Sequence, residues 1–150
     1  MPQSLGRIIV HVVFSTHGRT RCLDDVIRPR VHAYLATVTR DSGSEAYRVG
    51  GTDDHVHLAV QLGRTVAVAD LVERVKSTSS TWIKTVGEAY GGFAWQRGYG
   101  AFSVSASNLD EVLHYISTQD EHHRRLSFQE EYRLFLQRHG VAWDERYVWD

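Results

Sequence analysis

The chain has 150 residues, 42% of them hydrophobic, and a formal net charge of −1 at pH 7. This length predicts one compact domain that buries about 70% of the surface exposed by the unfolded chain, so neither disulfides nor a structural metal are needed for stability. A net charge so close to zero argues against a protein that binds duplex DNA mainly by bulk electrostatic attraction.

Two features predict the compartment. The single cysteine, Cys22, excludes an intramolecular disulfide and is typical of a reducing environment. The sequence has no apolar run of the roughly 18 residues that a membrane-spanning helix needs, and residues 1–6 lack the charged and apolar regions of a signal peptide. We therefore expect a cytoplasmic protein with no membrane partner.

The first predicted strand covers residues 6–15 and is rich in β-branched side chains. Alternation gives it an apolar core face and a second face. The core face holds Ile8, Val10, Val12 and Phe14, and the second face holds Ile9, His11, Val13 and Ser15. We interpret His11 as a packed or hydrogen-bonded histidine in preference to a metal ligand. A basic loop, 16–21, follows.

A helix is expected next, from a cap at Asp24 or Asp25 to about Arg40. Pro29 lies inside this segment, so either packing tolerates it or the helix begins near it. A second strand, Glu45 to Gly51, follows and turns directly into a third. Because the turn is so short, these two strands are expected to be antiparallel neighbours.

The third strand lies within residues 52–62 and carries two histidines on one face. Val56, Leu58, Val60 and Leu62 alternate with His55, His57, Ala59 and Gln61. The two histidine Cα atoms are therefore about 6–7 Å apart, and both rings can bind one metal ion. The alternative is an ordinary half-exposed strand, so this pattern alone is a weak indication of a metal site.

A second helix is expected from Thr65 or Asp70 to about Val86. Its hydroxyl-rich segment 77–81 indicates either close packing of small residues or contact with a phosphate backbone. Residues 87–100 are rich in glycine and aromatic side chains, which either stack on DNA bases or simply pack. The candidates for stacking are Phe93, Trp95 and Tyr99.

A fourth strand, 101–105, precedes a third helix predicted from Leu109 to about Arg125, capped by Ser107 or Asn108. Tyr115 and Gln119 lie four residues apart on this helix, so a phenol and a carboxamide share one edge of it. A tyrosine beside an apolar stripe usually belongs to the core. A short helix is expected over 128–139, and the acidic, aromatic tail is expected to pack against the body or a partner.

The predicted order of strands and helices defines the fold class. The sequence β-α-β-β-α-β-α favours a single α+β domain, residues 1–150. We expect a ferredoxin-like antiparallel four-stranded sheet with helices on one face and a C-terminal helix that bears Tyr115. The histidine strand would be central, and its histidine face would be open.

These segments together resemble a known family, the single-tyrosine HUH transposases of the insertion-sequence 200/605 group, which includes the REP-associated tyrosine transposases. HUH denotes histidine, a bulky apolar residue and histidine, here His55-Val56-His57. The resemblance covers most of the chain. It also includes residues 11–16, Val75-Lys76-Ser77, residues 95–105 and Tyr115-Ile116-Ser117-Thr118-Gln119.

The resemblance implies roles for individual residues. Tyr115 would be the nucleophile that attacks single-stranded DNA and forms a 5′-phosphotyrosine. His55, His57 and the side-chain oxygen of Gln119 would bind one divalent ion, Mg²⁺ or Mn²⁺. The tyrosine needs a proton acceptor, because a phenol is mostly protonated at neutral pH, and the sequence does not identify that acceptor.

The resemblance also implies partners. Substrates would be single-stranded element ends that carry hairpins, and the protein would be a homodimer whose active site is shared between chains. The candidates for contacts to the DNA backbone are Arg19, Arg21, Lys76, Lys84 and Arg97.

The chain departs from the family pattern at two positions that are not proposed ligands. Asp53 stands where the family often has proline, and Ala59 where it often has leucine. The neighbouring Asp54 either orients His55 or forms the turn before the strand.

Two rival functions are weighed against an active strand transferase. One is a domesticated DNA hairpin-binding protein that keeps the fold without transposing. The other is a simple metal hydrolase whose activity would not depend on Tyr115.

Overall fold

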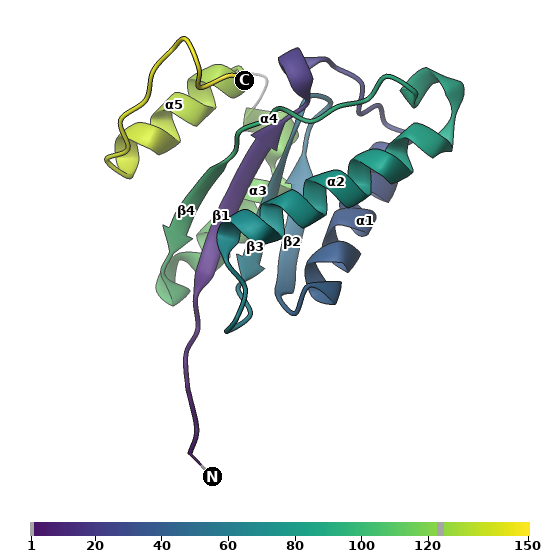
Figure 1. Ribbon diagram of the computed structural model, residues 1–150. Helices are drawn as coiled ribbons and strands as arrows, with labels where there is room; N and C mark the ends of the chain where they lie inside the picture. Colours follow the sequence, from purple (N-terminus) through teal and green to yellow (C-terminus); the bar gives the residue numbers. More distant parts are fainter. Residues whose placement is uncertain (1, 123–124) are drawn as a thin grey trace.

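A computed structural model describes residues 2–122 and 125–150, apart from the side chain of His122. Its centre is an antiparallel sheet with strand order β2-β3-β1-β4 (Figure 1). The strands are β1 (Ile9–Ser15), β2 (Glu45–Gly51), β3 (His55–Gln61) and β4 (Gly100–Val104). The predicted α+β, ferredoxin-like sheet is therefore confirmed, with the histidine strand β3 at a central position.

The helices lie on both sides of this sheet. In Figure 1, α1 (Arg28–Asp41) and α2 (Val68–Val86) lie in front of the strands, and α3 (Leu109–Ser117) lies behind them. The remaining helices are α4 (Gln119–His122) and α5 (Phe128–Arg138), with 3-10 turns at His17–Arg19, Glu88–Tyr90 and Ala106–Asn108. Among the described residues, no helix is long and apolar enough to cross a membrane.

The start of α1 depends on Asp24. Its carboxylate accepts hydrogen bonds from the backbone N–H groups of Val26 and Ile27, 3.0 Å each. The helix itself begins at Arg28, which places Pro29 in the first turn, where no backbone N–H is required. The helix therefore begins near Pro29, which is the second of the two predicted alternatives, and does not contain this proline in its interior.

The predicted third helix is wrong in its extent. Helix α3 ends at Ser117, and Thr118 leaves the helical conformation with φ −108° and ψ 26° before α4 begins. The N–H of Thr118 donates to the carbonyls of His114 and Tyr115, which closes the last turn. Residues 123 and 124 of the predicted helix lie outside the described residues.

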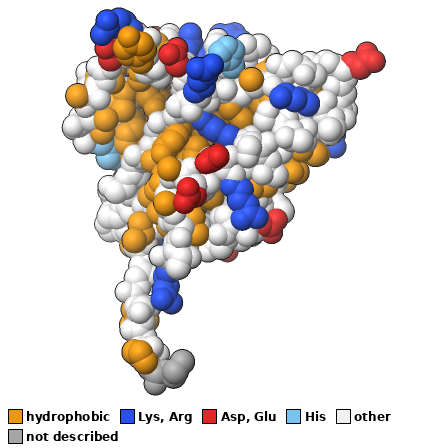
Figure 2. Space-filling model, viewed as in Figure 1, with side chains coloured by type: hydrophobic (Ala, Val, Ile, Leu, Met, Phe, Trp, Pro, Cys, Tyr) orange, Lys and Arg blue, Asp and Glu red, His pale blue; other side chains and the backbone are white. Residues whose placement is uncertain are grey.

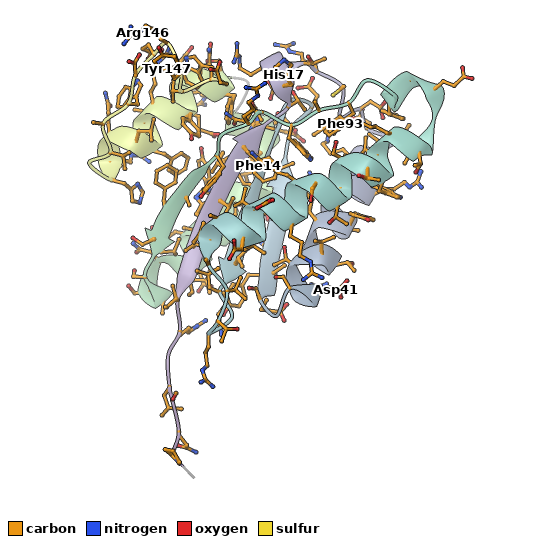
Figure 3. All side chains as sticks on the ribbon, viewed as in Figure 1. Phe14, His17, Asp41, Phe93, Arg146 and Tyr147 are labelled. Carbon is orange, nitrogen blue, oxygen red and sulfur yellow. The ribbon has the colours of Figure 1, made fainter. Side chains whose placement is uncertain are left out.

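One face of the sheet forms the larger core. Val10, Val12 and Phe14 of β1 join Val56, Leu58 and Val60 of β3 beneath α1 and α2. Phe14 lies between β1 and α2 in Figure 3. The predicted alternation is confirmed, except that Ile8 is 63% exposed because β1 begins at Ile9, three residues later than predicted.

The prediction of an open histidine face is wrong. His11, His55 and His57 are 0–2% exposed, because a second apolar cluster closes this side of the sheet. The cluster consists of Val13, Phe102, Phe128, Tyr132 and Leu136. Burial of its aromatic and aliphatic surface holds α5 in place.

The C-terminal tail packs against the body of its own chain. The carbonyl of Asp150 accepts a 2.8 Å hydrogen bond from the N–H of Gly98, and Trp149 packs against the second cluster. Figure 2 shows hydrophobic side chains gathered on this corner of the molecule, over the region of α5 and the tail in Figure 1. The tail therefore completes the layer that covers the histidines.

Close approach of α3 to the sheet depends on Gly50 of β2. A Cβ atom at this position would lie 2.6 Å from the carbonyl oxygen of Ile116 and 2.7 Å from its Cγ2 atom. Gly50→Ala should therefore push α3 outward and lower the free energy of unfolding by about 1–3 kcal/mol.

Urea unfolding measures this loss. Gly92→Ala is the matched control, because a Cβ atom at Gly92 meets nothing within 4 Å. Equal free energies of unfolding for the two variants would contradict the tight packing of α3 on β2.

Candidate active site

The strand register brings the histidine pair to the covered face. His55 lies opposite Ser15, and His57 lies opposite Val13, both on the neighbouring strand β1. Alternation along β3 then sends Val56 to the opposite core and both imidazoles towards α3 and α5. The two rings lie 5.1 Å apart between centroids.

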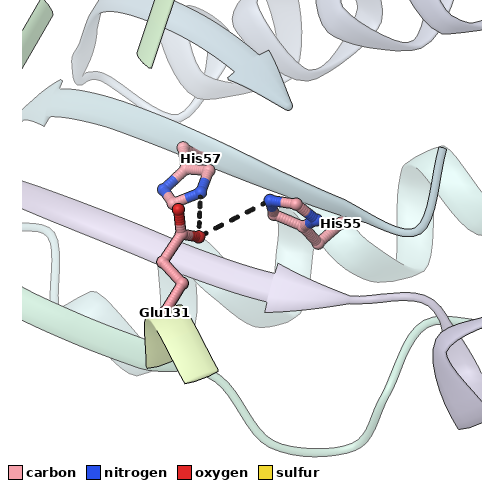
Figure 4. A group of neighbouring side chains, drawn as sticks. All are labelled: His55, His57 and Glu131. Atoms are coloured by element: carbon pink, nitrogen blue, oxygen red, sulfur yellow. Dashed lines mark hydrogen bonds and ion pairs between the residues drawn. The ribbon is translucent and has the colours of Figure 1, made fainter. Parts of the chain in front are cut away.

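Four side chains from three parts of the chain meet at one point. His57 Nε2 lies 2.9 Å from Glu131 Oε1, and His55 Nε2 lies 3.6 Å from the same oxygen (Figure 4). Gln119 Oε1 lies 2.9 Å from His55 Nε2, and the Gln119 amide donates to Glu131 Oε2 over 3.4 Å. All four side chains are 0–2% exposed.

The chemistry of this group fits a divalent cation. The ligand atoms of His55, His57 and Glu131 all lie within 4.8 Å of one another. Octahedral ions bind ligands at about 2.0–2.1 Å, which separates neighbouring ligand atoms by roughly 3 Å. The observed distances of 2.9 Å and 3.6 Å are close to that spacing. A site with both nitrogen and oxygen ligands suits Mn²⁺ better than Mg²⁺, but it can bind either ion.

Asp54 fixes the proton of His55. The carboxylate oxygen Oδ1 lies 2.7 Å from His55 Nδ1, so this nitrogen donates its proton to it, and Thr52 Oγ1 lies 3.0 Å away. In the neutral ring, Nε2 then presents a lone pair to Gln119 Oε1, which is also an acceptor. A cation between His55 Nε2 and Gln119 Oε1 would stabilise this pair of acceptors. Of the two alternatives for Asp54, the structure therefore shows contact with His55.

Tyr115 reaches the same group from α3. Its hydroxyl donates a hydrogen bond to Glu131 Oε2, and its ring centroid lies 5.8 Å from that of His57. Burial, followed by the adjacent negative charge of Glu131, raises the pKa of Tyr115 well above its usual value. Tyr115 and Gln119 also remain near each other across the break at Thr118, with the Gln119 amide 3.4 Å from the Tyr115 carbonyl.

Comparison with known proteins gives the family. The model of the family described as "Transposase IS200 like" matches residues 4–119. The chain belongs to this transposase family. No curated protein matches the sequence.

Two solved structures share the fold of this transposase. One is assigned as a transposase from Deinococcus radiodurans R1, with 20% identity and a TM-score of 0.62, over 79% of this chain and 98% of that one. The other is a REP-associated tyrosine transposase bound to a REP hairpin, with 12% identity and a TM-score of 0.60, over 82% of this chain and 74% of that one.

Glu131 is the residue that the sequence analysis of the transposase missed. It lies beyond the residues that the family model matches, in a helix that was predicted without a role. One signal was present, because the apolar stripe of this helix follows the helical spacing 128, 131, 132, 135 and 136. An acidic residue in the middle of such a stripe indicates a buried carboxylate with a partner.

The basic residues predicted to contact DNA do not all line one pocket. Lys76 and Arg97 line the same groove, between α2 and residues 94–99, whereas Arg21 lines a different pocket with several aspartates. The guanidinium of Arg19 lies 5.8 Å from the Trp149 ring centroid, and Lys84 is exposed near the end of α2. Their contacts to DNA stay predictions.

Lys76 has a structural role that was not expected. Its ammonium donates to the carbonyls of Gln96 and Gly98, at 2.8 Å and 2.5 Å, and burial lowers its pKa to about 8. It thereby holds the turn after Trp95.

The small and aromatic residues of this region mostly pack. The indole N–H of Trp95 donates to Ser79 Oγ over 2.9 Å, and Phe93 and Trp95 are buried. Tyr99 is 37% exposed. Of the two alternatives for the hydroxyl-rich segment, close packing of small residues rather than contact with a phosphate backbone is therefore correct at Ser79.

The charge of Glu131 contributes to the raised pKa of Tyr115, and this can be measured. Glu131→Gln removes the charge but keeps the size, so the pKa of Tyr115 should fall in the metal-free protein and stay above its usual value because the ring is still buried. NMR titration of ¹³Cζ-labelled tyrosine measures this shift, and Tyr115→Phe identifies the signal.

Glu130→Gln is the control for this titration, since Glu130 is exposed on the same helix. An unchanged Tyr115 titration in Glu131→Gln would show that the carboxylate does not interact with the phenol.

Proposed function

We propose that this transposase cleaves and rejoins single-stranded DNA at hairpin-containing element ends, through a 5′-phosphotyrosine intermediate and with a divalent metal. The observation that carries the proposal is the contact between the Tyr115 hydroxyl and Glu131, because the same carboxylate also contacts the histidine pair. The nucleophile and the candidate metal ligands thus meet at one side chain.

The reaction follows from the chemistry of these groups. The Tyr115 oxygen attacks the phosphorus of the scissile phosphodiester, an O–P bond forms, and the bond from phosphorus to the 3′ oxygen breaks. The phenolic proton passes to Glu131 Oε2, its hydrogen-bond acceptor, and the released 3′ oxygen takes up a proton from solvent. In rejoining, a 3′ hydroxyl attacks the phosphotyrosine and the proton returns to Tyr115.

The metal would be held by His55 Nε2, His57 Nε2, Gln119 Oε1 and Glu131 Oε1. The expected ligand set of two histidines and Gln119 is thereby extended by Glu131. When bound, Mg²⁺ or Mn²⁺ polarises the scissile phosphate and stabilises the charge that develops on it. The His55 and His57 rings keep their positions on a central strand of the sheet, which limits their movement during the reaction.

Hairpin DNA is the proposed substrate because one solved relative in fold was bound to a REP hairpin. The four candidate ligands are almost fully buried, so a scissile phosphate has no room beside them in the present arrangement. We therefore infer that DNA binding widens the gap between α3 and α5. Arg19, Arg21, Lys76, Lys84 and Arg97 remain the candidates for contacts to the DNA backbone.

Trapping of the covalent intermediate tests this proposal. Labelled single-stranded DNA that ends in a hairpin from the element, incubated with the protein and Mn²⁺, should form an adduct that is stable on a denaturing gel. Tyr115→Phe and chelation of Mn²⁺ by EDTA should each abolish it, whereas Tyr147→Phe, at an exposed tyrosine outside the site, should not.

Other outcomes identify the rival functions. An undiminished adduct in Tyr115→Phe would contradict the assignment of the nucleophile. Tight binding of cognate hairpin DNA without an adduct would favour a domesticated hairpin-binding protein. Turnover of nucleotides or esters by Tyr115→Phe would favour a metal hydrolase.

We further propose that the transposase is a homodimer with an active site shared between chains. Within one chain, Tyr115 already contacts Glu131 beside its own histidines, so sharing requires α3 to exchange between the two copies. A mixture of His57→Ala and Tyr115→Phe should then recover cleavage that neither variant has, because one shared site would be intact.

Analytical ultracentrifugation supplies the control for the mixture by showing whether dimers are present. A mixture that forms dimers but does not cleave would show that each chain uses its own tyrosine.

A further inference from the structure

A third histidine, His11, contacts the side of His57 that faces away from the candidate metal site. His11 lies on β1 opposite Ala59, and His57 on β3 lies opposite Val13, so the two rings are diagonal neighbours on the covered face. His11 Nε2 lies 2.7 Å from His57 Nδ1, and His11 is 2% exposed. Water therefore does not compete for the hydrogen bond between His11 Nε2 and His57 Nδ1.

The direction of this hydrogen bond determines which nitrogen of His57 can bind a metal. A neutral imidazole carries one proton, and the nitrogen that binds a metal must present its lone pair. His57 Nε2 is the atom that faces Glu131 Oε1, at 2.9 Å. The proton of metal-bound His57 must therefore be on Nδ1, and His11 Nε2 lies within hydrogen-bond distance of this nitrogen as an acceptor.

We propose that His11 is a positioning residue for the metal site: it accepts the Nδ1 proton of His57 and so holds this ring in the tautomer and orientation that binds the ion. The proposal rests on the metal site proposed above. Outer hydrogen bonds of this kind typically change metal affinity by about 10–100-fold.

The second histidine of the pair supports this role. His55 Nδ1 donates to Asp54 Oδ1 over 2.7 Å, so its Nε2 is likewise turned to the site. Both rings therefore have an acceptor on the outer nitrogen, a carboxylate for one and an imidazole for the other. The two acceptors differ in origin, since Asp54 is adjacent to its histidine in sequence and His11 is 46 residues away.

Contacts from α5 fix the orientation of His11 itself. Phe135 meets the His11 ring edge to face, with 5.0 Å between centroids and 85° between planes. The His11 and His57 rings are inclined by only 30°, at a centroid distance of 4.9 Å. His11 is therefore not a further ligand, because its Nε2 is directed at the nitrogen of His57 that points away from Glu131.

Mn²⁺ titration without DNA tests the role of His11 separately from catalysis. Isothermal calorimetry, or electron paramagnetic resonance of free Mn²⁺, gives the affinity. His11→Phe keeps a ring but has no acceptor, so Mn²⁺ binding should weaken by about 10–100-fold. His11→Gln offers an amide oxygen instead and should restore the affinity to within a few-fold of the original. His17→Phe, at an exposed histidine, is the matched control and should bind normally.

A second readout separates positioning from a purely structural role. In the Mg²⁺ complex, long-range ¹H–¹⁵N spectra of the imidazoles should show the His57 proton on Nδ1 in the original protein and in His11→Gln. Circular dichroism and thermal unfolding should show that His11→Phe is folded.

The outcomes also distinguish the two proposals. Absence of Mn²⁺ binding in the original protein would overturn the metal site itself. Normal Mn²⁺ binding that is lost in His57→Ala but kept in folded His11→Phe would overturn the role of His11 alone. Equal loss in His11→Phe and His11→Gln would also overturn it, because the acceptor would then not be what matters.

Discussion

A buried carboxylate, that of Glu131, is the interaction on which the site depends. Transfer of a charged carboxylate from water to a protein interior is costly unless it is paired and hydrogen-bonded. Without a metal ion, Glu131 meets this requirement through His57, the Tyr115 hydroxyl and the Gln119 amide, which come from a strand and two helices. The same contacts that stabilise the buried charge thus hold α5 against β3 and α3.

The two faces of the sheet have different roles, one in stability and one in the candidate site. The face under α1 and α2 is a conventional apolar core, formed by the inward residues of β1 and β3. The other face combines a smaller apolar cluster with a polar group of histidines, Gln119, Glu131 and Tyr115. Since the histidines lie on the two central strands, each with a neighbour on both sides, their backbone is held by the sheet.

Closure of the second face has a consequence for substrate entry. The candidate ligands are almost fully buried, yet the proposed reaction needs a DNA phosphate beside Tyr115. Tyr115 is less buried than the ligands, and α4 is a single turn that follows the break at Thr118. Short helical segments with few contacts are the parts of a protein that open at the lowest free-energy cost. In the proposed opening for DNA, movement at α4 and at the break before it therefore costs least, and the sheet stays unchanged.

The sequence by itself determined the strands, the antiparallel pairing of β2 with β3 and the placement of His55 and His57 on one face, because alternation and short turns are local properties. Its resemblance to a family also selected Tyr115 and Gln119. Only the tertiary structure decided what covers the histidines. The contact of Glu131 with His57 joins residues 74 positions apart, and that of His11 with His57 joins residues 46 apart. No local pattern records such pairs, because they arise from how the helices pack over the sheet. The same reason explains why the ammonium of Lys76, a candidate for DNA contact, lies against backbone carbonyls of a distant turn.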